Sequence, residues 1–496
     1  MREPGTLYAV LAIYFATHVV LRLILPNALE LDEGQQLFLA QWLALGYDDQ
    51  PPFYNWLQYG VVQLLGDTVL ALTLLKNAML FSSYLLIGLA ARLTMRNRAL
   101  EIMAVLGLLT LPQLAFEAQR DLTHTVAAVF ASALFIASMF WMLSRGNILA
   151  YAATGVAIGI GVLSKYNFVL LPPLLFLAVL FEPGLRRRVL NWRIIVTAVL
   201  AAAVIFPHAR WFFHNLDAAT AETIGKLTDK AAADGVSQVV EGLFSLVIAL
   251  FATATLTVLI YWISFGRRFH ESWTASSPWS RIIGRTFLLI VAALIVLVVF
   301  GGMAHVKDRW LTPFFVMLPL YFSLKLDALN QTIGNAPKRF GAIMILAMIA
   351  IPLVLFIRVP AAQYLGQYQK LNVPYQPAIA DILVSGKHRP SLIMASDMQL
   401  AGSICLAVQH IPVVTPGYEH FEKGYRFDPD HPILLVWRNK GEANAALPEA
   451  MRRMLSAEVV AGAATPVPQD IAKPYHYGKP GDAYHFQYAW IYPPTP

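Results

Sequence analysis

The sequence has 496 residues and a formal net charge of +7, and 57% of its residues are hydrophobic while only 14% are charged. Its mean hydropathy of +0.56 lies outside the usual range of water-soluble proteins, so the composition excludes a soluble protein and indicates an integral membrane protein. The basic residues fall in short loops between apolar stretches, which argues against nucleic-acid binding. The single cysteine, Cys405, excludes an intramolecular disulfide.

Apolar stretches of the length needed to cross a bilayer, roughly 20 residues, recur about eleven times before residue 360. They lie at 7–26, 68–91, 99–115, 122–143, 148–164, 167–181, 194–209, 239–265, 286–302, 310–326 and 341–357. The third, fifth, sixth and seventh are short, so we expect tilted helices or re-entrant backbone there. The first stretch lacks a basic flank followed by a small-residue cleavage site, and we interpret it as a membrane anchor. The sequence therefore predicts an all-α polytopic membrane domain over residues 1–360.

Arginine and lysine concentrate in alternate loops. Examples are Arg92, Arg96, Arg98, Arg145, Arg186, Arg187, Arg188, Arg267, Arg268, Lys338 and Arg339. The positive-inside rule predicts that these loops and the N-terminus are cytoplasmic. An odd number of spans then places the acidic first loop and everything after Arg358 on the outer side.

The last part of the chain changes in composition. Proline and charged residues become frequent after residue 360, and short β-like runs occur at 391–396, 432–437 and 484–492, separated by turn signals. We expect a small soluble α/β domain over residues 361–496. The membrane part lacks two matching halves with broken helices, which disfavours a secondary transporter.

The first outer loop is acidic and aromatic. Asp32 and Glu33 follow the first apolar stretch and open an amphipathic run, "GQQLFLAQWLALG", that is typical of a helix lying in the membrane interface. These carboxylates could simply cap that helix. The loop continues to "QPPFYNW", where two prolines fix the chain beside Tyr54. Aromatic and amide groups beside carboxylates are common in sugar recognition, which favours a binding function for the loop.

Further charged and polar side chains lie at the outer ends of later spans. They are Glu117, Arg120, Asp121, His124, Lys165, Tyr166, His305, Lys307, Asp308 and Arg309. Ionisable groups at membrane depth are costly and usually face a partner or a wet cavity. For any one of them, a structural pair or a loop reaching water is the alternative. Because all lie at the same end, we expect them to line one outward cavity, with carboxylates on one wall and cations on another.

Such a cavity suits a phosphate-bearing lipid whose headgroup carries the reacting bond. Cations stabilise charge on a phosphate leaving group, and a carboxylate removes a proton from an attacking hydroxyl. The sequence thus predicts glycosyl transfer from a polyprenyl-phosphate sugar. The alternatives are a transporter or flippase of a lipid-linked anionic sugar, and a membrane scaffold whose outer tail binds a glycan through aromatic residues such as Tyr475 and Trp490.

Five motifs occur in an ordered series: "LDEGQQ", "QPPFYNWL", "RDLTHTVAAVFASALF", "GVLSKYNFVLLPPLL" and "KDRWLTPFFVMLPL". Over residues 1–360 they resemble the GT-C glycosyltransferase superfamily, in the branch of the protein O-mannosyltransferases and the lipid A 4-amino-4-deoxy-arabinose transferase. The resemblance implies an inverting transferase in which Asp32 and Glu33 are catalytic. It also implies that Lys165, Arg309 and Lys307 bind the donor phosphate.

The expected substrate pocket includes Arg120, Asp121, Tyr54, Tyr166, Glu117 and His305. No cofactor is required, although a divalent ion bridging Asp32, Glu33 and a histidine such as His124 or His305 is an option. The implied partners are a polyprenyl-phosphate sugar and a lipid or glycan acceptor such as lipopolysaccharide or lipid A, at the outer, periplasmic face of a bacterial inner membrane. Nucleic acid is not among them.

One residue departs from the pattern of the family. Relatives often have Lys or His before the double proline, where this chain has Gln50, which leaves the identity of the sugar open. The surrounding stretch most resembles alphaproteobacterial transferases that add sugars, including galacturonic acid, to lipopolysaccharide. The amphipathic segment 221–235 is interpreted as an outer loop that gates acceptor entry.

Overall fold

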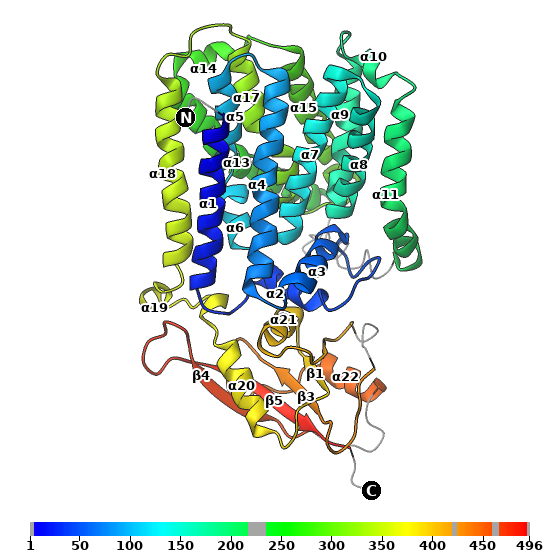
Figure 1. The fold of residues 1–496 in the computed structure, drawn as a ribbon, viewed down its shortest axis with the longest axis vertical. Helices are drawn as coiled ribbons and strands as arrows, with labels where there is room; N and C mark the ends of the chain where they lie inside the picture. The colour runs from blue at the N-terminus through cyan, green and yellow to red at the C-terminus, as the bar shows by residue number, and fades with distance from the viewer. Residues whose placement is uncertain (1–3, 217–234, 419–423, 459–465, 494–496) are drawn as a thin grey trace. The chain divides into compact units, whose positions relative to one another are not determined.

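The computed structural model describes residues 4–216, 235–418, 424–458 and 466–493. The chain divides into two compact units, the first made of Met1–Ala16, Ala44–Tyr54 and Lys76–Ile351, the second of Thr17–Leu43, Asn55–Leu75 and Pro352–Pro496. Helices make up most of the first unit, and a mixed sheet belongs to the second (Figure 1). The predicted domain boundary at residue 360 stays a prediction. The proposed gate at 221–235 lies outside the described residues, except for Gly235.

Long apolar helices confirm the predicted multi-pass membrane fold. By length and composition, seven helices of the described chain can cross a membrane. They are α1 (Pro4–Ile24), α4 (Val69–Thr94), α7 (Thr123–Arg145), α11 (Ile194–His214), α13 (Gly235–Phe265), α15 (Pro278–Phe300) and α18 (Ala336–Ile357). The bent pair Arg98–Thr110 and Gln113–Arg120, with an angle of 70°, would be an eighth.

Every other predicted stretch is helical but short or broken. The bent pair consists of α5 (Arg98–Leu106), η1 (Gly107–Thr110), η2 (Gln113–Glu117) and α6 (Ala118–Arg120). The remaining stretches form α8 (Ile148–Ser164), η3 (Tyr166–Leu170), α9 (Leu171–Leu180), α16 (Asp308–Phe315) and α17 (Leu318–Asp327). Pro112 lies at the bend, and proline breaks a helix because it lacks an N–H and clashes with the preceding turn. These interruptions place non-helical backbone, able to bind polar groups, beside the apolar spans.

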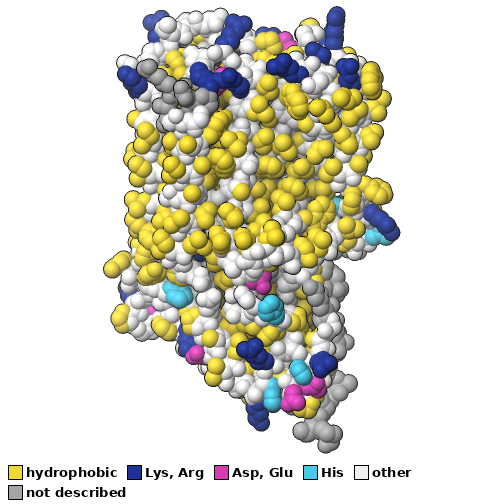
Figure 2. Space-filling view, in the orientation of Figure 1, with side chains coloured by type: hydrophobic (Ala, Val, Ile, Leu, Met, Phe, Trp, Pro, Cys, Tyr) yellow, Lys and Arg dark blue, Asp and Glu magenta, His cyan; other side chains and the backbone are white. Residues whose placement is uncertain are grey.

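The surface of the helix bundle has a lipid-facing character. Figure 2 shows hydrophobic side chains over its sides and Lys and Arg at one end. On α15, Leu288 is 73% exposed and Phe300 is 84% exposed, which fits a surface covered by hydrocarbon. We call the end that carries Arg92, Arg145, Arg187, Arg267 and Arg339 the Arg-rich end.

The second unit contains a five-stranded sheet with the order β2-β1-β3-β5-β4. The strands are β1 (Leu392–Ala395), β2 (Val413–Val414), β3 (Ile433–Trp437), β4 (Gln469–Pro474) and β5 (Ala483–Ile491). β1 runs parallel to β2 and β3, whereas β5 is antiparallel to β3 and β4. The helices are α20 (Tyr375–Ser385), α21 (Met398–Ala407) and α22 (Glu449–Glu458), with short α19 (Ala362–Leu365) and η4 (Lys370–Asn372) before them. The predicted small α/β domain is confirmed.

Two helices from the first loop belong to this second unit or reach into it, namely α2 (Leu31–Leu39) and α3 (Phe53–Leu65). α2 packs against α21 through two glycines: a Cβ on Gly402 would lie 2.0 Å from the carbonyl oxygen of Gly34. The Gln399 side chain on α21 also donates to the Leu29 carbonyl at 2.7 Å. The predicted helical first loop is therefore held by residues as far as 370 positions later in the chain.

This glycine contact gives a stability prediction. Gly402→Ala should destabilise the protein by about 2 kcal/mol, because the new methyl group meets backbone that cannot rotate away. Thermal unfolding of the detergent-solubilised protein measures the change. Gly60→Ala in α3 is the matched control, since its Cβ would meet nothing within 4 Å and should not lower stability. Equal unfolding temperatures of the two variants would contradict the close α2–α21 contact.

An ion pair between the buried Arg438 and the partly exposed Asp397 fixes the start of α21. Asp397 caps the helix by accepting from the Leu400 N–H at 2.9 Å, and it accepts from Arg438 Nη2 at 3.0 Å. The Arg438 side chain is only 8% exposed and also contacts the Tyr375 hydroxyl and the Gln399 amide oxygen. Burial alone would raise the pKa of Asp397, but the ion pair and the N–H bond outweigh it and lower that pKa.

A carboxylate whose pKa is lowered on folding stabilises the protein above its unfolded pKa, about 3.9, and this stabilisation is lost as the pH falls through the lower folded pKa. Wild-type stability should therefore drop below about pH 4, and Asp397→Asn, which keeps an oxygen for the Leu400 N–H, should drop less. Unfolding temperature against pH measures this. The control Asp430→Asn removes a 76% exposed carboxylate and should retain the wild-type drop. Parallel curves for Asp397→Asn and wild type would exclude the ion pair as a source of the pH dependence.

Candidate active site

The predicted acidic pair lies in the first turn of α2. Glu30 is the N-cap residue, and its backbone N–H donates to Glu33 Oε2 at 3.2 Å, closing a capping box. Asp32 is half-buried, whereas Glu33 is 2% exposed. Glu33 therefore does cap the helix, which was the alternative function considered from the sequence.

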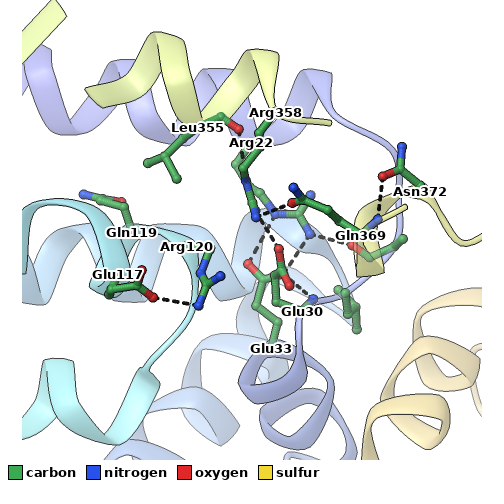
Figure 3. A network of polar contacts seen from close by, with 12 residues as sticks. Arg22, Glu30, Glu33, Glu117, Gln119, Arg120, Leu355, Arg358, Gln369 and Asn372 are labelled. Atoms are coloured by element: carbon green, nitrogen blue, oxygen red, sulfur yellow. Dashed lines mark hydrogen bonds and ion pairs between the residues drawn. The ribbon is translucent and has the colours of Figure 1, made fainter. Parts of the chain in front are cut away.

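Glu33 also belongs to an ion-pair network within the second unit (Figure 3). Arg22 at the end of α1 donates to both Glu33 oxygens, with Nε–Oε1 3.2 Å and Nη2–Oε2 2.8 Å. Arg358 after α18 donates to Glu30 Oε1 and to Gln369 Oε1, both at 2.6 Å. Sequence reasoning missed both arginines, although each is a charge at the end of an apolar stretch. The network fixes the turn that carries Asp32.

In the first unit, the cationic residues gather around the starts of α7 and α16. Lys165 caps the C-terminus of α8 and donates to Thr125 Oγ1 at 3.0 Å. Two residues later, Asn167 Nδ2 donates to the Trp310 carbonyl at 2.8 Å. The second contact joins the segment that follows Lys165 to the helix that carries Arg309.

Asp308 connects α16 to the bent helix pair. Its Oδ1 accepts from the Arg309 N–H at 2.8 Å, and its Oδ2 accepts from Gln113 Nε2 at 2.9 Å. Lys307 is the N-cap of α16, and its ammonium lies 6.0 Å from the centre of the Trp310 ring. His305 lies two residues before Lys307, in the loop that precedes α16. The N–H of the next residue, Val306, donates to Ser245 Oγ at 2.9 Å and so attaches this loop to α13.

The helical segment after the bend, η2 and α6, carries the predicted pocket residues Glu117 and Arg120, and Asp121 is its C-cap. Glu117 and Arg120 form an ion pair of 2.7 Å on a half-exposed surface. Lys76 on α4, to which the sequence assigned no function, is 2% exposed and donates to the Gln119 carbonyl at 3.4 Å. Lys76 therefore holds the end of α6 in place.

Aromatic and imidazole rings form another side of this cluster. His208 Nδ1 lies 2.8 Å from the Leu45 carbonyl and so carries the proton, which leaves Nε2 to accept from the Tyr166 hydroxyl at 3.0 Å. The Tyr54 ring lies 6.2 Å from the His124 ring.

Gln50, the residue that departs from the family pattern, donates to Asp49 Oδ2 at 2.9 Å. Asp49 is only 3% exposed, and sequence reasoning gave it no function. Asp49, the buried carboxylate two residues before the double proline, is therefore a missed candidate for the sugar-binding side of the site.

The predicted residues of the first unit are Tyr54, Glu117, Arg120, Asp121, Lys165, Tyr166, His305, Lys307 and Arg309. Hydrogen bonds join the segment after Lys165 to Trp310 and the start of α16 to the bent helix pair, and the single cavity expected for these residues stays a prediction. Asp32 and Glu33 belong to the second unit, so their approach to the cations stays a prediction. Across the described ranges, no three His, Cys, Asp or Glu side chains are arranged to hold a metal ion, and the optional divalent ion also stays a prediction.

Comparison with known proteins identifies the family of the chain. Residues 49–211 match the family model described as dolichyl-phosphate-mannose-protein mannosyltransferase. The chain is 41% identical to the lipopolysaccharide core galacturonosyltransferase RgtB of Rhizobium johnstonii, over 99% of both chains. It is 37% identical to the galacturonosyltransferase RgtA of the same organism, over 100% of this chain and 99% of the relative.

The fold agrees with a solved structure. ArnT from Cupriavidus metallidurans bound to undecaprenyl phosphate superposes with a TM-score of 0.63 at 12% identity, covering 98% of this chain and 97% of ArnT. The relatives by sequence are transferases, which supports transfer of a sugar over transport or a scaffold function. The chain belongs to the GT-C superfamily of membrane glycosyltransferases, in the family of the two Rhizobium galacturonosyltransferases.

Proposed function

We propose that this glycosyltransferase transfers galacturonic acid, with inversion, from a polyprenyl-phosphate donor to the core of lipopolysaccharide at the outer face of the inner membrane. The observation that carries the proposal is the 41% identity to a lipopolysaccharide core galacturonosyltransferase along almost the whole chain. The polyprenyl-phosphate donor is further supported by the likeness to an enzyme fold solved with undecaprenyl phosphate.

The cations of the first unit suit this donor. A polyprenyl-phosphate galacturonate carries two anionic groups, the phosphate and the uronate carboxylate. The Asn167–Trp310 hydrogen bond joins the segment after Lys165 to the helix of Arg309, and Lys307 is the N-cap of that same helix. Guanidinium and ammonium groups bind such oxygens through charge-assisted hydrogen bonds. In this proposal Lys165 and Arg309 hold the phosphate, and Lys307 or Arg120 the carboxylate.

The chemical step is a displacement at the anomeric carbon. A hydroxyl oxygen of the acceptor attacks this carbon while the bond from carbon to phosphate oxygen breaks, and polyprenyl phosphate leaves with the electron pair. Asp32 accepts the hydroxyl proton, and the cations stabilise the charge on the departing phosphate. Glu33 serves as a positioning residue, because both of its oxygens already accept from Arg22.

The location follows from the distribution of charge. The Arg-rich end is assigned to the cytoplasm by the positive-inside rule, so the cluster around Lys165 and Arg309 faces the periplasm. The soluble domain follows α18 and lies on the periplasmic side in this orientation.

The proposal is tested by incubating the purified protein with labelled polyprenyl-phosphate galacturonic acid and lipopolysaccharide core acceptor. Labelled lipopolysaccharide together with released polyprenyl phosphate is the expected result. In proteoliposomes, movement of the donor between leaflets without cleavage would instead identify a flippase and overturn the proposal.

The two acidic residues of α2 should behave differently when neutralised. Asp32→Asn should lower kcat by about 100-fold or more, since the general base is lost, with little change in thermal stability. Glu33→Gln should lower the free energy of unfolding by about 3 kcal/mol, because it leaves the Arg22 charge, 11% exposed, without its carboxylate partner. Turnover assays and thermal unfolding of both variants measure this contrast.

Asp430→Asn, the same chemical change at an exposed position of the soluble domain, is the control and should resemble wild type in both assays. Transfer that survives Asp32→Asn undiminished would remove this residue from catalysis. A stable but inactive Glu33→Gln variant would return Glu33 to the chemical step.

Removal of the cations should weaken donor use. Lys165→Ala and Arg309→Ala are each expected to reduce kcat/KM for the donor by about 10- to 100-fold, the value of one charge-assisted hydrogen bond. Lys338→Ala, an exposed lysine at the start of α18, is the control. The measurement is kinetics at varied donor and saturating acceptor. An unchanged kcat/KM in both site variants would place the phosphate elsewhere.

A further inference from the structure

A second cationic site lies at the Arg-rich end of the first unit, between the end of α13 and the start of α18. It is a hollow of about 580 Å³. Its charged lining residues are Arg267, Arg268, Glu271 and Arg339. The donor cluster described above consists of other residues, so this hollow needs an explanation of its own.

Two glycines shape this hollow. Gly266, with a φ of 54°, turns the chain from α13 into α14 (Arg267–Ser272), and Gly334, with a φ of 55°, precedes α18. Side-chain-bearing residues rarely adopt such positive φ values. A Cβ on Gly334 would lie 3.0 Å from Arg268 Nη1, so the missing side chain lets the guanidinium lie against the loop.

Positive charge exceeds negative charge in the hollow. Arg267 pairs with Glu271 at 2.9 Å. Toward the residues that the structure describes, the side chains of Arg268 and Arg339 make no hydrogen bond or ion pair. Two guanidinium groups that repel each other in one hollow favour an anion between them, and planar guanidinium forks match the oxygens of phosphate.

The hollow lies at the depth of lipid headgroups. The span α13 ends at Phe265 and the span α18 begins at Ala336, and residues on both sides of these ends line the hollow. Trp262 and Trp273 are 58% and 54% exposed nearby in the chain, as is typical of aromatic residues at a membrane interface. A phosphate bound here would therefore lie where membrane phospholipids place theirs.

An apolar depression of about 450 Å³, which we call the α13 groove, lies along one face of α13, the helix that ends at this hollow. Its lining residues are Leu250, Phe251, Ala254, Thr255, Val258, Leu259 and Trp262, and Phe265 of the hollow continues the row at helical spacing. The lining residues extend from Leu250 to Trp262, about 18 Å along the helix, which is the length scale of an acyl chain. Free phosphate would leave this apolar groove unoccupied, whereas a phospholipid would fill it with an acyl chain.

We propose that the hollow and the groove together bind one anionic phospholipid of the leaflet at the Arg-rich end. Arg268 and Arg339 hold its phosphate, and the α13 groove holds an acyl chain. This lipid is distinct from the polyprenyl donor, and the proposal does not depend on the proposed glycosyl transfer.

Native mass spectrometry with phosphatidylglycerol or phosphatidylethanolamine tests the proposal. The double variant Arg268→Gln/Arg339→Gln should retain phosphatidylglycerol about tenfold less than wild type. The loss for phosphatidylethanolamine should be smaller, because its ammonium group offsets the phosphate charge and already weakens its binding to the arginines. Arg145→Gln/Arg187→Gln is the matched control, since it removes the same charge from exposed arginines of the same end outside the hollow. Ala254→Trp, which fills the groove and keeps the arginines, should also reduce retention.

The possible outcomes separate the explanations. Equal losses in the Arg268/Arg339 and Arg145/Arg187 variants would show general surface charge and overturn the site. Retention that is unchanged in Ala254→Trp would remove the groove from the proposal. An excess of inorganic phosphate that displaces phosphatidylglycerol and raises the unfolding temperature equally would show a site for free phosphate instead of a lipid.

Discussion

The ion pair between Arg22 and Glu33 is the interaction on which the presentation of the candidate base depends. A guanidinium at the end of a membrane span is costly unless a partner compensates its charge, and here the carboxylate accepts from two of its nitrogens. The same carboxylate accepts from the Glu30 N–H and so fixes the first turn of α2. Asp32 lies between these two tethered residues, and its position is therefore determined by groups that need not take part in any chemistry.

The glycine contact between α2 and α21 extends this constraint to the end of the chain. Because Gly34 and Gly402 have no side chains, the two helices approach to backbone distance, and Gln399 can reach the Leu29 carbonyl. α21 is in turn fixed by Asp397, which caps it and pairs with the buried Arg438 directly after β3. The soluble domain thus supports the first loop. This explains why the compact unit that contains the sheet also contains residues from the beginning of the sequence.

Hydropathy and periodicity predict most of the local structure but few of these long-range contacts. The apolar stretches and the β-like runs were recognised as helices and strands because burial requires hydrophobic residues at regular spacing. β2 has only two residues and β4 is mostly exposed, so neither strand shows this spacing in the sequence. The segments of Lys165 and Arg309 are joined by the Asn167–Trp310 hydrogen bond, and the sequence could suggest their proximity because both residues lie at the same end of their helices. The tether of Asp308 to Gln113 was not, since the choice of partner depends on how separate helices pack. Arg22 was missed because a charge in the last turn of a span carries no indication of its partner.

Two sets of arginines in this chain differ in burial and partners. Arg22, Arg358 and Arg438 have side chains that are 8–15% exposed, and each pairs with a carboxylate. Such pairing is needed because water no longer solvates these charges, and it leaves little capacity to bind a ligand anion. Arg339 is exposed and Arg268 half-buried, and at headgroup depth water and lipid phosphate can compensate their charge. Anion binding at the Arg-rich end therefore follows from incomplete burial, by the same physical rule that makes the buried arginines structural.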